Sequence, residues 1–441
     1  MKIILKNIGM LKEAKLNIDY LTVIAGENDN GKSTVGKVIF CIIKAMNRYK
    51  EDLQESKEYK INEKLESIFF LIRRTLGDLE NKSFLDSQNL YNLLDSQNLY
   101  TLLDSEINID EKINYLETLV QMIKKSNNID LKNLNRLEKL SEEAISIIKE
   151  PENIQKSIEN ALNKVFLSEF DSSILLDGEE EGFISLYENS LKLIEIKVTK
   201  DNRIHLLDNI EPIEIKDATF IESPLILNNH DLLIRSQSGL NLNKRNIDRL
   251  GIPYTTLHTK DLFDKLKKLS FNIFFEDDFE EIFRKEISNI VNGEIVYDND
   301  KKDFVYRKDN KLISIKNTAS GIKSFGIVQL LILNRVINSN SILILDEPEN
   351  HLHPKWQLKF AKILTELAKN NIYILVTSHS PYMIEALKRY SENNELKEKT
   401  NFYLAEDRYI NNEDRLGDIF SILSEPFEVF RKMDEELLKD E

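Results

Sequence analysis

The stretch Gly26-Glu27-Asn28-Asp29-Asn30-Gly31-Lys32-Ser33-Thr34 decides how this chain folds, because it fits the pattern G-x-x-x-x-G-K-[ST]. An apolar run, Leu21 to Ala25, precedes it, and apolar residues at helical spacing follow it from Val35 to Met46. A strand, a glycine-rich turn and a helix in this order cradle phosphates with backbone N–H groups and the positive end of the helix dipole. The sequence therefore predicts a phosphate loop at residues 26–34.

Each residue type in this loop has an expected task. Lys32 should reach the β- and γ-phosphates of a nucleotide, and the Ser33 hydroxyl should bind Mg²⁺. ATP and Mg²⁺ are therefore the expected ligands. The residues that we expect around the phosphates are Gly26, Asn28, Asn30, Gly31, Lys32, Ser33 and Thr34.

Two adjacent acids close a second apolar strand. The aliphatic run Ile342 to Leu345 is followed directly by Asp346 and Glu347. We expect Asp346 to hold Mg²⁺, directly or through water. Glu347 would be the general base that polarises the attacking water, because a base must lie beside the nucleophile. An ordinary buried strand with a polar turn does not account for two acids placed in this way.

His379 follows the predicted strand Ile372 to Val376. This places it at the carboxyl end of a sheet, where ligands bind in open α/β folds. We interpret His379 as a sensor of the γ-phosphate and count it with Lys32 and Glu347 as catalytic.

A third polar segment, Ala319-Ser320-Gly321-Ile322-Lys323-Ser324, opens a predicted helix, with Ser320 as its N-cap. An ordinary capped helix is the simpler interpretation of this segment alone. A helix N-terminus is also an anion site, and the phosphate loop already accounts for the phosphates of its own chain. We therefore predict that Ser320, Gly321 and Lys323 contact the γ-phosphate bound to a partner subunit.

Two histidines invite a metal-site interpretation. His351 and His353 lie in Asn350-His351-Leu352-His353-Pro354, and no third ligand accompanies them in sequence. Since zinc sites use three or four protein ligands, a structural or dimer-contact role is favoured for both.

Composition limits the class of protein. The 441 residues include 60 Lys and Arg against 75 Asp and Glu, so the net charge is −15. A chain-wide basic surface for nucleic acid is excluded, whereas a local basic groove, for example at Lys244 to Arg249, stays open. No apolar run is long enough for a membrane span. The single cysteine, Cys41, suits a reducing compartment, and we expect a cytoplasmic protein that does not contact membranes.

The pattern of elements predicts an α/β fold with a large helical insertion, because helices and strands alternate in the last third of the chain. A nine-residue repeat within the insertion, at residues 85–105, favours a recent duplication over a binding array. The expected parts are an N-lobe with the phosphate loop at 1–46, the helical insertion at 47–170, a strand-rich and helical part at 171–317, and a C-lobe at 318–441.

Together these segments resemble ABC-type ATPases of the branch that includes RecF, SMC and OLD proteins. The resemblance covers residues 1–45 and about 205–405, and it rests on residues 28–33, 319–324, 346–354 and 378–381. It implies a P-loop NTPase head, a mixed sheet with flanking helices, and ATP held between two subunits. Phe220-Ile221-Glu222-Ser223-Pro224 occupies the place of the Q-loop, without its glutamine, so Glu222 or Ser223 would take over its coupling to Mg²⁺.

The resemblance also suggests a biological role. Several such ATPases are subunits of anti-phage systems, of the Septu and PARIS types, that partner a separate nuclease or toxin. The segment after His379 is too short for the Toprim nuclease of OLD proteins. We therefore expect an ATPase switch in a homodimer or higher homo-oligomer that controls a separate effector.

Two other classes of function remain. The first is a RecF-like ATPase that repairs or binds DNA directly. The second is the ATPase of an importer, which Ser320-Gly321-Ile322 argues against, because transporters have Ser-Gly-Gly or Ser-Gly-Glu there. The segment between Lys32 and Ser320 has no long heptad array, so we expect a compact helical lobe and no SMC-type coiled-coil arm.

Overall fold

The computed structural model describes residues 1–49, 131–149, 154–171, 173–188, 191–208, 213–238, 254–268, 278–309, 311–411 and 415–437, with isolated positions between 61 and 121. The chain forms two compact units: Met1–Asn47 together with Ile158–Glu441, and Arg48–Ser157. The repeat at 85–105 and the basic stretch Lys244 to Arg249 lie outside the described residues. None of the described helices is both long and apolar enough to cross a membrane.

The second unit is described in part, and there it is helical. Helix α5 (Leu131–Lys149) belongs to it, and Glu143 on this helix forms an ion pair with Lys64 at 2.6 Å. The expected insertion ran to residue 170, but the first unit resumes at Ile158. Most of helix α6 (Ile154–Glu169) therefore packs with the first unit, which buries Leu162, Val165 and Phe166.

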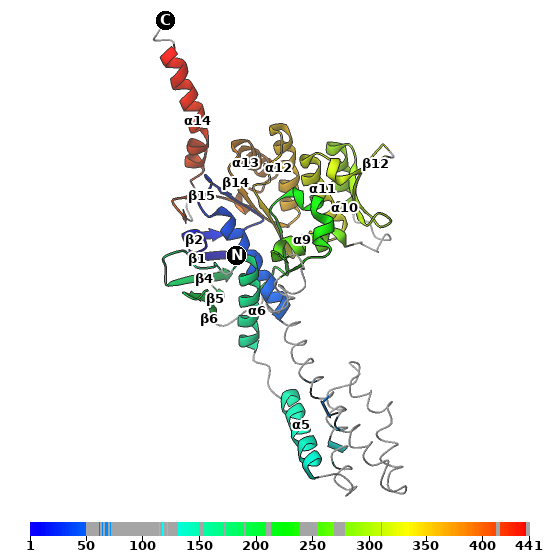
Figure 1. The fold of residues 1–441 in the computed structure, drawn as a ribbon. Coiled ribbons are helices and arrows are strands. Elements are labelled where there is room, and N and C mark those ends of the chain that lie inside the picture. Colours follow the sequence, from blue (N-terminus) through cyan, green and yellow to red (C-terminus); the bar gives the residue numbers. More distant parts are fainter. Residues whose placement is uncertain are drawn as a thin grey trace. The chain divides into compact units, whose positions relative to one another are not determined.

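One large sheet organises the first unit (Figure 1). Among the described residues it has eleven strands, which lie in the order β6 (Ile204–Leu206), β5 (Leu191–Thr199), β4 (Glu181–Glu188), β1 (Lys2–Ile8), β2 (Leu11–Asn17), β16 (Tyr409–Ile410), β15 (Thr400–Glu406), β3 (Leu21–Ala25), β14 (Tyr373–Ser378), β13 (Ser341–Asp346) and β7 (Asp217–Ile221).

The sheet has two halves of different direction. Strands β15, β3, β14, β13 and β7 are parallel neighbours, whereas β6, β5, β4, β1 and β2 are antiparallel. The sequence predicted a mainly parallel sheet from its last third, and that holds for one half. The other half is antiparallel because short hairpins, such as the turn between Ile8 and Leu11, join neighbouring strands, and parallel neighbours need a long crossover. The expected α/β fold with a mixed sheet and flanking helices is confirmed.

Helices cover both faces of the parallel half. On one face, the core joins Val23, Leu343 and Val376 of the sheet to Phe325 and Leu364 of the helices. The helices of that side are α9 (Leu257–Lys267), α10 (Asp278–Val291), α11 (Ser320–Leu333), α12 (Pro354–Lys369) and α13 (Pro381–Asn393). The helix at residues 32–49 lies on the opposite face, where a Cβ at Gly36 would lie 2.8 Å from Ile344 Cγ2 of β13. Burial on both faces explains why β3 is apolar along almost its whole length.

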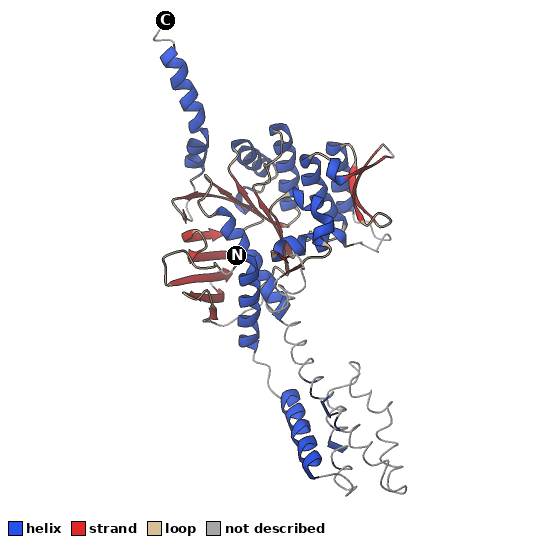
Figure 2. Cartoon of the chain, in the orientation of Figure 1, coloured by secondary structure: helices blue, strands red, loops and turns tan. Residues whose placement is uncertain are grey.

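The remaining described elements are short connections, a three-stranded sheet of β10, β11 and β12, a two-stranded sheet of β8 and β9, and a terminal helix. Figure 2 shows the three-stranded sheet apart from the main one. These elements are η1 (Pro224–Asn229), α7 (His230–Leu233), β8 (Gln237–Ser238), β9 (Tyr254–Thr255), β10 (Glu294–Asp298), β11 (Asp303–Lys308), β12 (Lys311–Ser314), η2 (Ile315–Asn317), η3 (Lys397–Lys399) and α14 (Leu416–Leu437).

Two sequence patterns predict local structure wrongly. The apolar alternation of Ile213 to Ile215 predicts a strand, but these residues form the approach to β7. Both isoleucines are buried there, so packing alone accounts for the apolar alternation. The apolar pattern of residues 320–338 predicts one helix over that range, but the helix ends at Leu333, because Arg335 adopts a left-handed backbone with φ 56°.

Candidate functional site

The phosphate loop leaves the end of β3 at Gly26 and enters the helix at Lys32. Gly26 and Gly31 have φ values of 149° and 78°, which favour glycine. A Cβ at Gly26 would lie 2.4 Å from the carbonyl oxygen of Ala405, and one at Gly31 would lie 2.7 Å from Leu11 Cδ2. The loop is therefore pressed against two neighbouring strands, and only glycine fits at these positions.

Lys32 spans the loop. Its side chain is 4% exposed, and Nζ donates to the carbonyl oxygens of Gly26 at 3.0 Å and Glu27 at 2.8 Å. The same Nζ lies 3.5 Å from Oε1 of Glu347, beyond the end of β13. A buried ammonium held by neutral carbonyls and one carboxylate is a suitable partner for a phosphate group.

Ser33 and Asp346 meet across the sheet edge. Ser33 Oγ donates to Asp346 Oδ1 at 2.9 Å, and Thr377 Oγ1 donates to the same oxygen. Strand register explains the second contact, because Asp346 and Thr377 are opposite each other in β13 and β14. Burial, together with the charges of Glu347 and Glu222, raises the pKa of Asp346 above its usual value. A divalent cation would relieve this unfavourable environment of the carboxylate.

Glu347 has an unusual backbone. Its φ is 47°, and its N–H donates to both the carbonyl and the hydroxyl of Thr377 at 3.1 Å. Asn350 Nδ2 donates to Oε2 at 3.1 Å, while His379 Nδ1 lies 3.3 Å from Oε1. Burial tends to raise the pKa of Glu347, but Asn350, His379 and Lys32 outweigh it and hold the pKa below its usual value. This carboxylate is therefore ionised and directed into the site.

Glu349 organises the turn that carries His379, and sequence reasoning missed it. This carboxylate accepts hydrogen bonds from Ser378 Oγ at 2.7 Å, from the N–H of His379 at 2.8 Å and from the N–H of Ser380 at 3.2 Å. Only 3% of its side chain is exposed, and burial raises its pKa. The signal was an acid two residues after Glu347, but nothing local indicated that it would be buried.

A cavity of about 160 Å³ lies between the ends of β7 and β13. Asp346 and Glu347 line it from one side and Glu222 and Ser223 from the other, and His351 also contributes. Sites for drug-sized ligands usually measure about 300–1,000 Å³. This cavity therefore suits water, a metal ion or one phosphate group, and the rest of a nucleotide would lie outside it.

The family comparison agrees with this geometry. A family model described as an AAA ATPase domain matches residues 1–384, which is most of the chain and includes the phosphate loop, Asp346, Glu347 and His379. The chain belongs to the AAA ATPase domain family. The sequence predicts the same kind of domain.

The other matching proteins cover less of this chain or share less sequence identity with it. An uncharacterised protein of Methanocaldococcus jannaschii, MJ1542, is 31% identical over 121 residues, which is 27% of this chain and 14% of that protein. The SMC head domain of Thermotoga maritima aligns over 87% of this chain and 90% of its own, with 13% identity and a TM-score of 0.33. A Pyrococcus furiosus Smc head with an extended coiled coil, bound to the C-terminal domain of ScpA, aligns over 96% and 98%, with 10% identity and a TM-score of 0.32. These similarities add nothing to the family assignment.

The residues of this AAA ATPase domain fit both ATP and Mg²⁺. Lys32 presents a buried cation beside a glycine loop that a Cβ would block. The Ser33 hydroxyl and the Asp346 carboxylate are hard oxygen ligands 2.9 Å apart, which is the donor type that Mg²⁺ prefers. Lys32, Ser33, Asp346, Glu347 and His379 therefore come together as the sequence predicted.

The other loop residues have lesser contacts. Asn28 is exposed, and Asn30 accepts a hydrogen bond from the N–H of Arg408 at 3.4 Å. Thr34 is buried, and its Cγ2 would lie 2.8 Å from a Cβ at Gly9.

His353 has a structural role, since its Nδ1 accepts a hydrogen bond of 3.2 Å from the N–H of Lys355 and so caps α12. Within the described part of the chain, no cluster of three or more His, Cys, Asp or Glu could hold a metal.

The start of α11 corrects two expectations. Ala319 is the N-cap, and Ser320 is the first helical residue, with no side-chain capping hydrogen bond. Lys323 is 3% exposed, and its Nζ donates to Asn228 Oδ1 at 2.8 Å. Its ammonium is thus engaged inside its own subunit, because its position on α11 faces η1. Ala319 is exposed, and Ser320 is half-buried.

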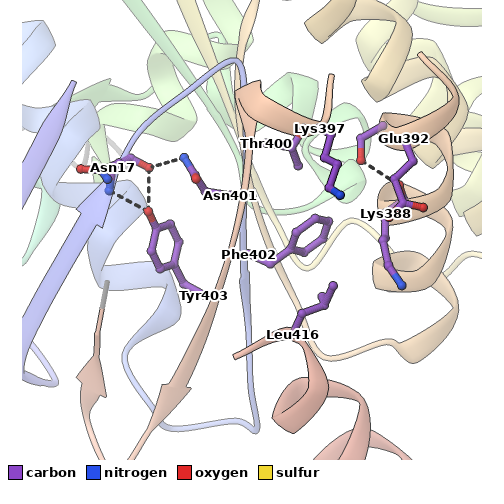
Figure 3. Close-up of a pocket in the computed structure, with 10 residues that line it drawn as sticks. Asn17, Lys388, Glu392, Lys397, Thr400, Asn401, Phe402, Tyr403 and Leu416 are labelled. Carbon is purple, nitrogen blue, oxygen red and sulfur yellow. Dashed lines mark hydrogen bonds between the residues drawn. The ribbon is translucent and has the colours of Figure 1, made fainter. Parts of the chain in front are cut away.

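A larger cavity of about 370 Å³ is lined by residues of β15, of α13 and of the start of α14 (Figure 3). There, Asn401 Nδ2 and Tyr403 Oη each donate to the carbonyl oxygen of Asn17 at 3.2 Å. Thr400, at the start of β15, lines this cavity, whereas the phosphate loop follows the end of the neighbouring parallel strand β3. None of residues 26–34, Asp346, Glu347 or His379 lines this cavity, so it is not the nucleotide site.

Proposed function

We propose that this ATPase hydrolyses ATP at the edge where β3, β13 and β14 end, and that two copies close around the nucleotide. One observation carries the proposal. Nζ of Lys32 lies 3.5 Å from Oε1 of Glu347, beside the hydrogen-bonded pair of Ser33 and Asp346. A cation for phosphate and an ionised base thus lie in one site, supplied by different segments of the chain. The test is the loss of hydrolysis in Glu347→Gln that the Discussion describes.

The roles follow from position. Lys32 would bind the β- and γ-phosphates, and Ser33 and Asp346 would hold Mg²⁺, which when bound neutralises charge on the phosphates. Glu347 would accept a proton from the attacking water, because its lowered pKa keeps it ionised at neutral pH. His379 is 39% exposed beside it, so its ring is accessible to the γ-phosphate.

The dimer is supported by the size of the cavity and by α11. The cavity of about 160 Å³ is too small for a whole nucleotide, so most of ATP would lie on an open surface. Helix α11, whose Ser324 lines the cavity, begins without a side-chain cap and without an acid in its first turn. Among the described residues, the N–H groups of Ser320 and Gly321 donate no hydrogen bond. A phosphate bound to a second subunit would satisfy them.

We expect Ser320→Glu to prevent ATP-dependent dimerisation. The new carboxylate would repel the phosphate, yet it is favourable at a helix N-terminus, so the fold should not be weakened. The measurement is analytical ultracentrifugation with ATP and Mg²⁺ in a Glu347→Gln background, where hydrolysis is blocked. The expected effect is a shift of the monomer–dimer equilibrium by at least about tenfold, since like-charge juxtaposition costs several kcal/mol.

The matched control is Ser421→Glu, an exposed serine on α14 that receives the same charge. It should dimerise like the parent. A Ser320→Glu variant that dimerises normally would contradict the role proposed for α11.

The biological part of the proposal is effector control. The dimer would close on ATP and open after hydrolysis, and its state would control a separate nuclease or toxin in a cytoplasmic anti-phage complex. Its support is the resemblance to the ATPase subunits of such systems, carried by the same segments that build the site. Membership of the AAA ATPase domain family is shown independently of this role.

A tagged purification from the native host tests effector control. We expect a nuclease or toxin in stoichiometric amounts, identified by mass spectrometry, and its retention should differ between ATP-bound Glu347→Gln and nucleotide-free protein. If the ATPase instead purifies alone, or with DNA bound with a steep salt dependence, effector control is wrong. The second of these results would favour the RecF-like alternative.

A further inference from the structure

One buried histidine links the nucleotide site to α6. His258, in the first turn of α9, is 3% exposed and lies between two carboxylates. Its Nδ1 is 2.6 Å from Glu169 Oε1, and its Nε2 is 3.2 Å from Glu222 Oε2. Glu169 ends α6, and Glu222 directly follows β7.

Glu169 holds His258 from two directions. Its side chain is fully buried, and it also accepts the backbone N–H of His258 at 3.2 Å. The ring packs against Phe220 and Phe40, at centroid distances of 5.0 and 6.4 Å. A buried carboxylate needs a partner charge, and these contacts leave the imidazole little freedom. The ring is therefore a rigid support that presents Nε2 to Glu222.

The charges are consistent with a protonated imidazole. Burial tends to lower the pKa of His258, but hydrogen bonds and charges from Glu169 and Glu222 raise it to about 9. The hydroxyls of Thr259 and Thr256 also lie near Nε2, at 3.2 and 3.5 Å. With protons on both nitrogens, the ring donates to both carboxylates.

Glu222 needs such a support. It lines the cavity of Asp346 and Glu347, and 53% of its side chain is exposed. Among the described residues, the His258 ring is the only side chain that hydrogen-bonds to the Glu222 carboxylate. Without this contact, an exposed glutamate would sample several rotamers. Glu222 placed at the cavity edge can accept a hydrogen bond from bound water beside the phosphate.

We propose that His258 is a positioning residue for ATP hydrolysis, which holds Glu222 at the cavity edge and is itself held by Glu169. This inference rests on the site proposed above. The inference makes Glu222 part of the hydrolytic site. It also connects that site, through His258, to Glu169 at the end of α6. In sequence, most of α6 directly follows the Arg48–Ser157 unit.

A double-mutant cycle tests this inference. His258→Ala and Glu222→Ala should each lower kcat by about tenfold, with KM for ATP changed by less than about twofold, because neither side chain belongs to the phosphate loop. If His258 acts through Glu222, the double variant should be no slower than the slower single variant. His230→Gln is the matched control, since His230 is also buried in this unit and contacts Tyr297 Oη at 3.4 Å; its kcat should be unchanged.

Because His258→Ala leaves the buried Glu169 without a partner, it can fail to fold. The paired replacement Glu169→Gln with His258→Gln leaves no buried charge and should show the same loss of kcat and the same lack of additivity with Glu222→Ala. If the losses of kcat in the single variants multiply in the combined variant, His258 is only structural and the inference is overturned. A normal kcat in Glu222→Ala, while Glu347→Gln is inactive, would overturn it and leave the proposed function intact. An active Glu347→Gln would instead refute the proposed function.

Discussion

Replacing Glu347 by glutamine is expected to lower the rate of ATP hydrolysis by at least about 100-fold, because general bases contribute about 10²- to 10⁴-fold. The amide keeps the size of the side chain and the hydrogen bond with Asn350, but it cannot take a proton from water. Nucleotide affinity should be equal or higher, since a negative charge 3.5 Å from Lys32 is removed. Phosphate release at saturating ATP and Mg²⁺ measures the rate, and binding of a fluorescent ATP analogue measures the affinity.

Glu366→Gln on α12 is the control, because it makes the same replacement at a site outside the cavity. Its rate should equal that of the parent. Hydrolysis by Glu347→Gln at the parent rate would show that another group activates the water, and the assignment of Glu347 would be withdrawn.

Lys32→Ala should weaken ATP binding by about 10- to 150-fold. A hydrogen bond to a charged group contributes about 1.5–3 kcal/mol, and Lys32 is the buried ammonium of the loop. Hydrolysis should also fall at saturating ATP, because the same charge would act on the γ-phosphate. Isothermal titration with ATP and Mg²⁺ gives the affinity directly.

The control for this variant is Lys369→Ala, an exposed lysine at the end of α12. It should bind ATP like the parent. Fluorescence of the single tryptophan, Trp356, which packs against Phe325, checks that each variant is folded. A folded Lys32→Ala protein with unchanged affinity would contradict the proposed phosphate site.

Sequence patterns predicted the parts of the site that lie next to strand ends. The loop at 26–34, the acidic pair after Leu345 and His379 after β14 each follow an apolar run, and parallel strands bring these ends to one edge. The register could not be predicted, and it is the register that sets Thr377 opposite Asp346. For that reason the contact of Thr377 with Asp346 was missed.

Contacts between segments that are distant in sequence could not be predicted either. Glu169 and His258 are 89 positions apart, and Glu222 is 36 positions from His258, with no motif that links them. The burial of Lys323 was missed for a related reason, because the pattern of the signature segment does not reveal that η1 packs on α11 and offers Asn228. Local spacing predicts which residues follow a strand, whereas these contacts depend on how loops and helices pack.

The most direct test of the account is the mass of Glu347→Gln in solution, measured by analytical ultracentrifugation with and without ATP and Mg²⁺. If ATP is held between two copies, ATP should convert the protein to a dimer, and ADP should not. The same species in all conditions, with ATP bound at full occupancy, would contradict the central claim that two copies close around the nucleotide.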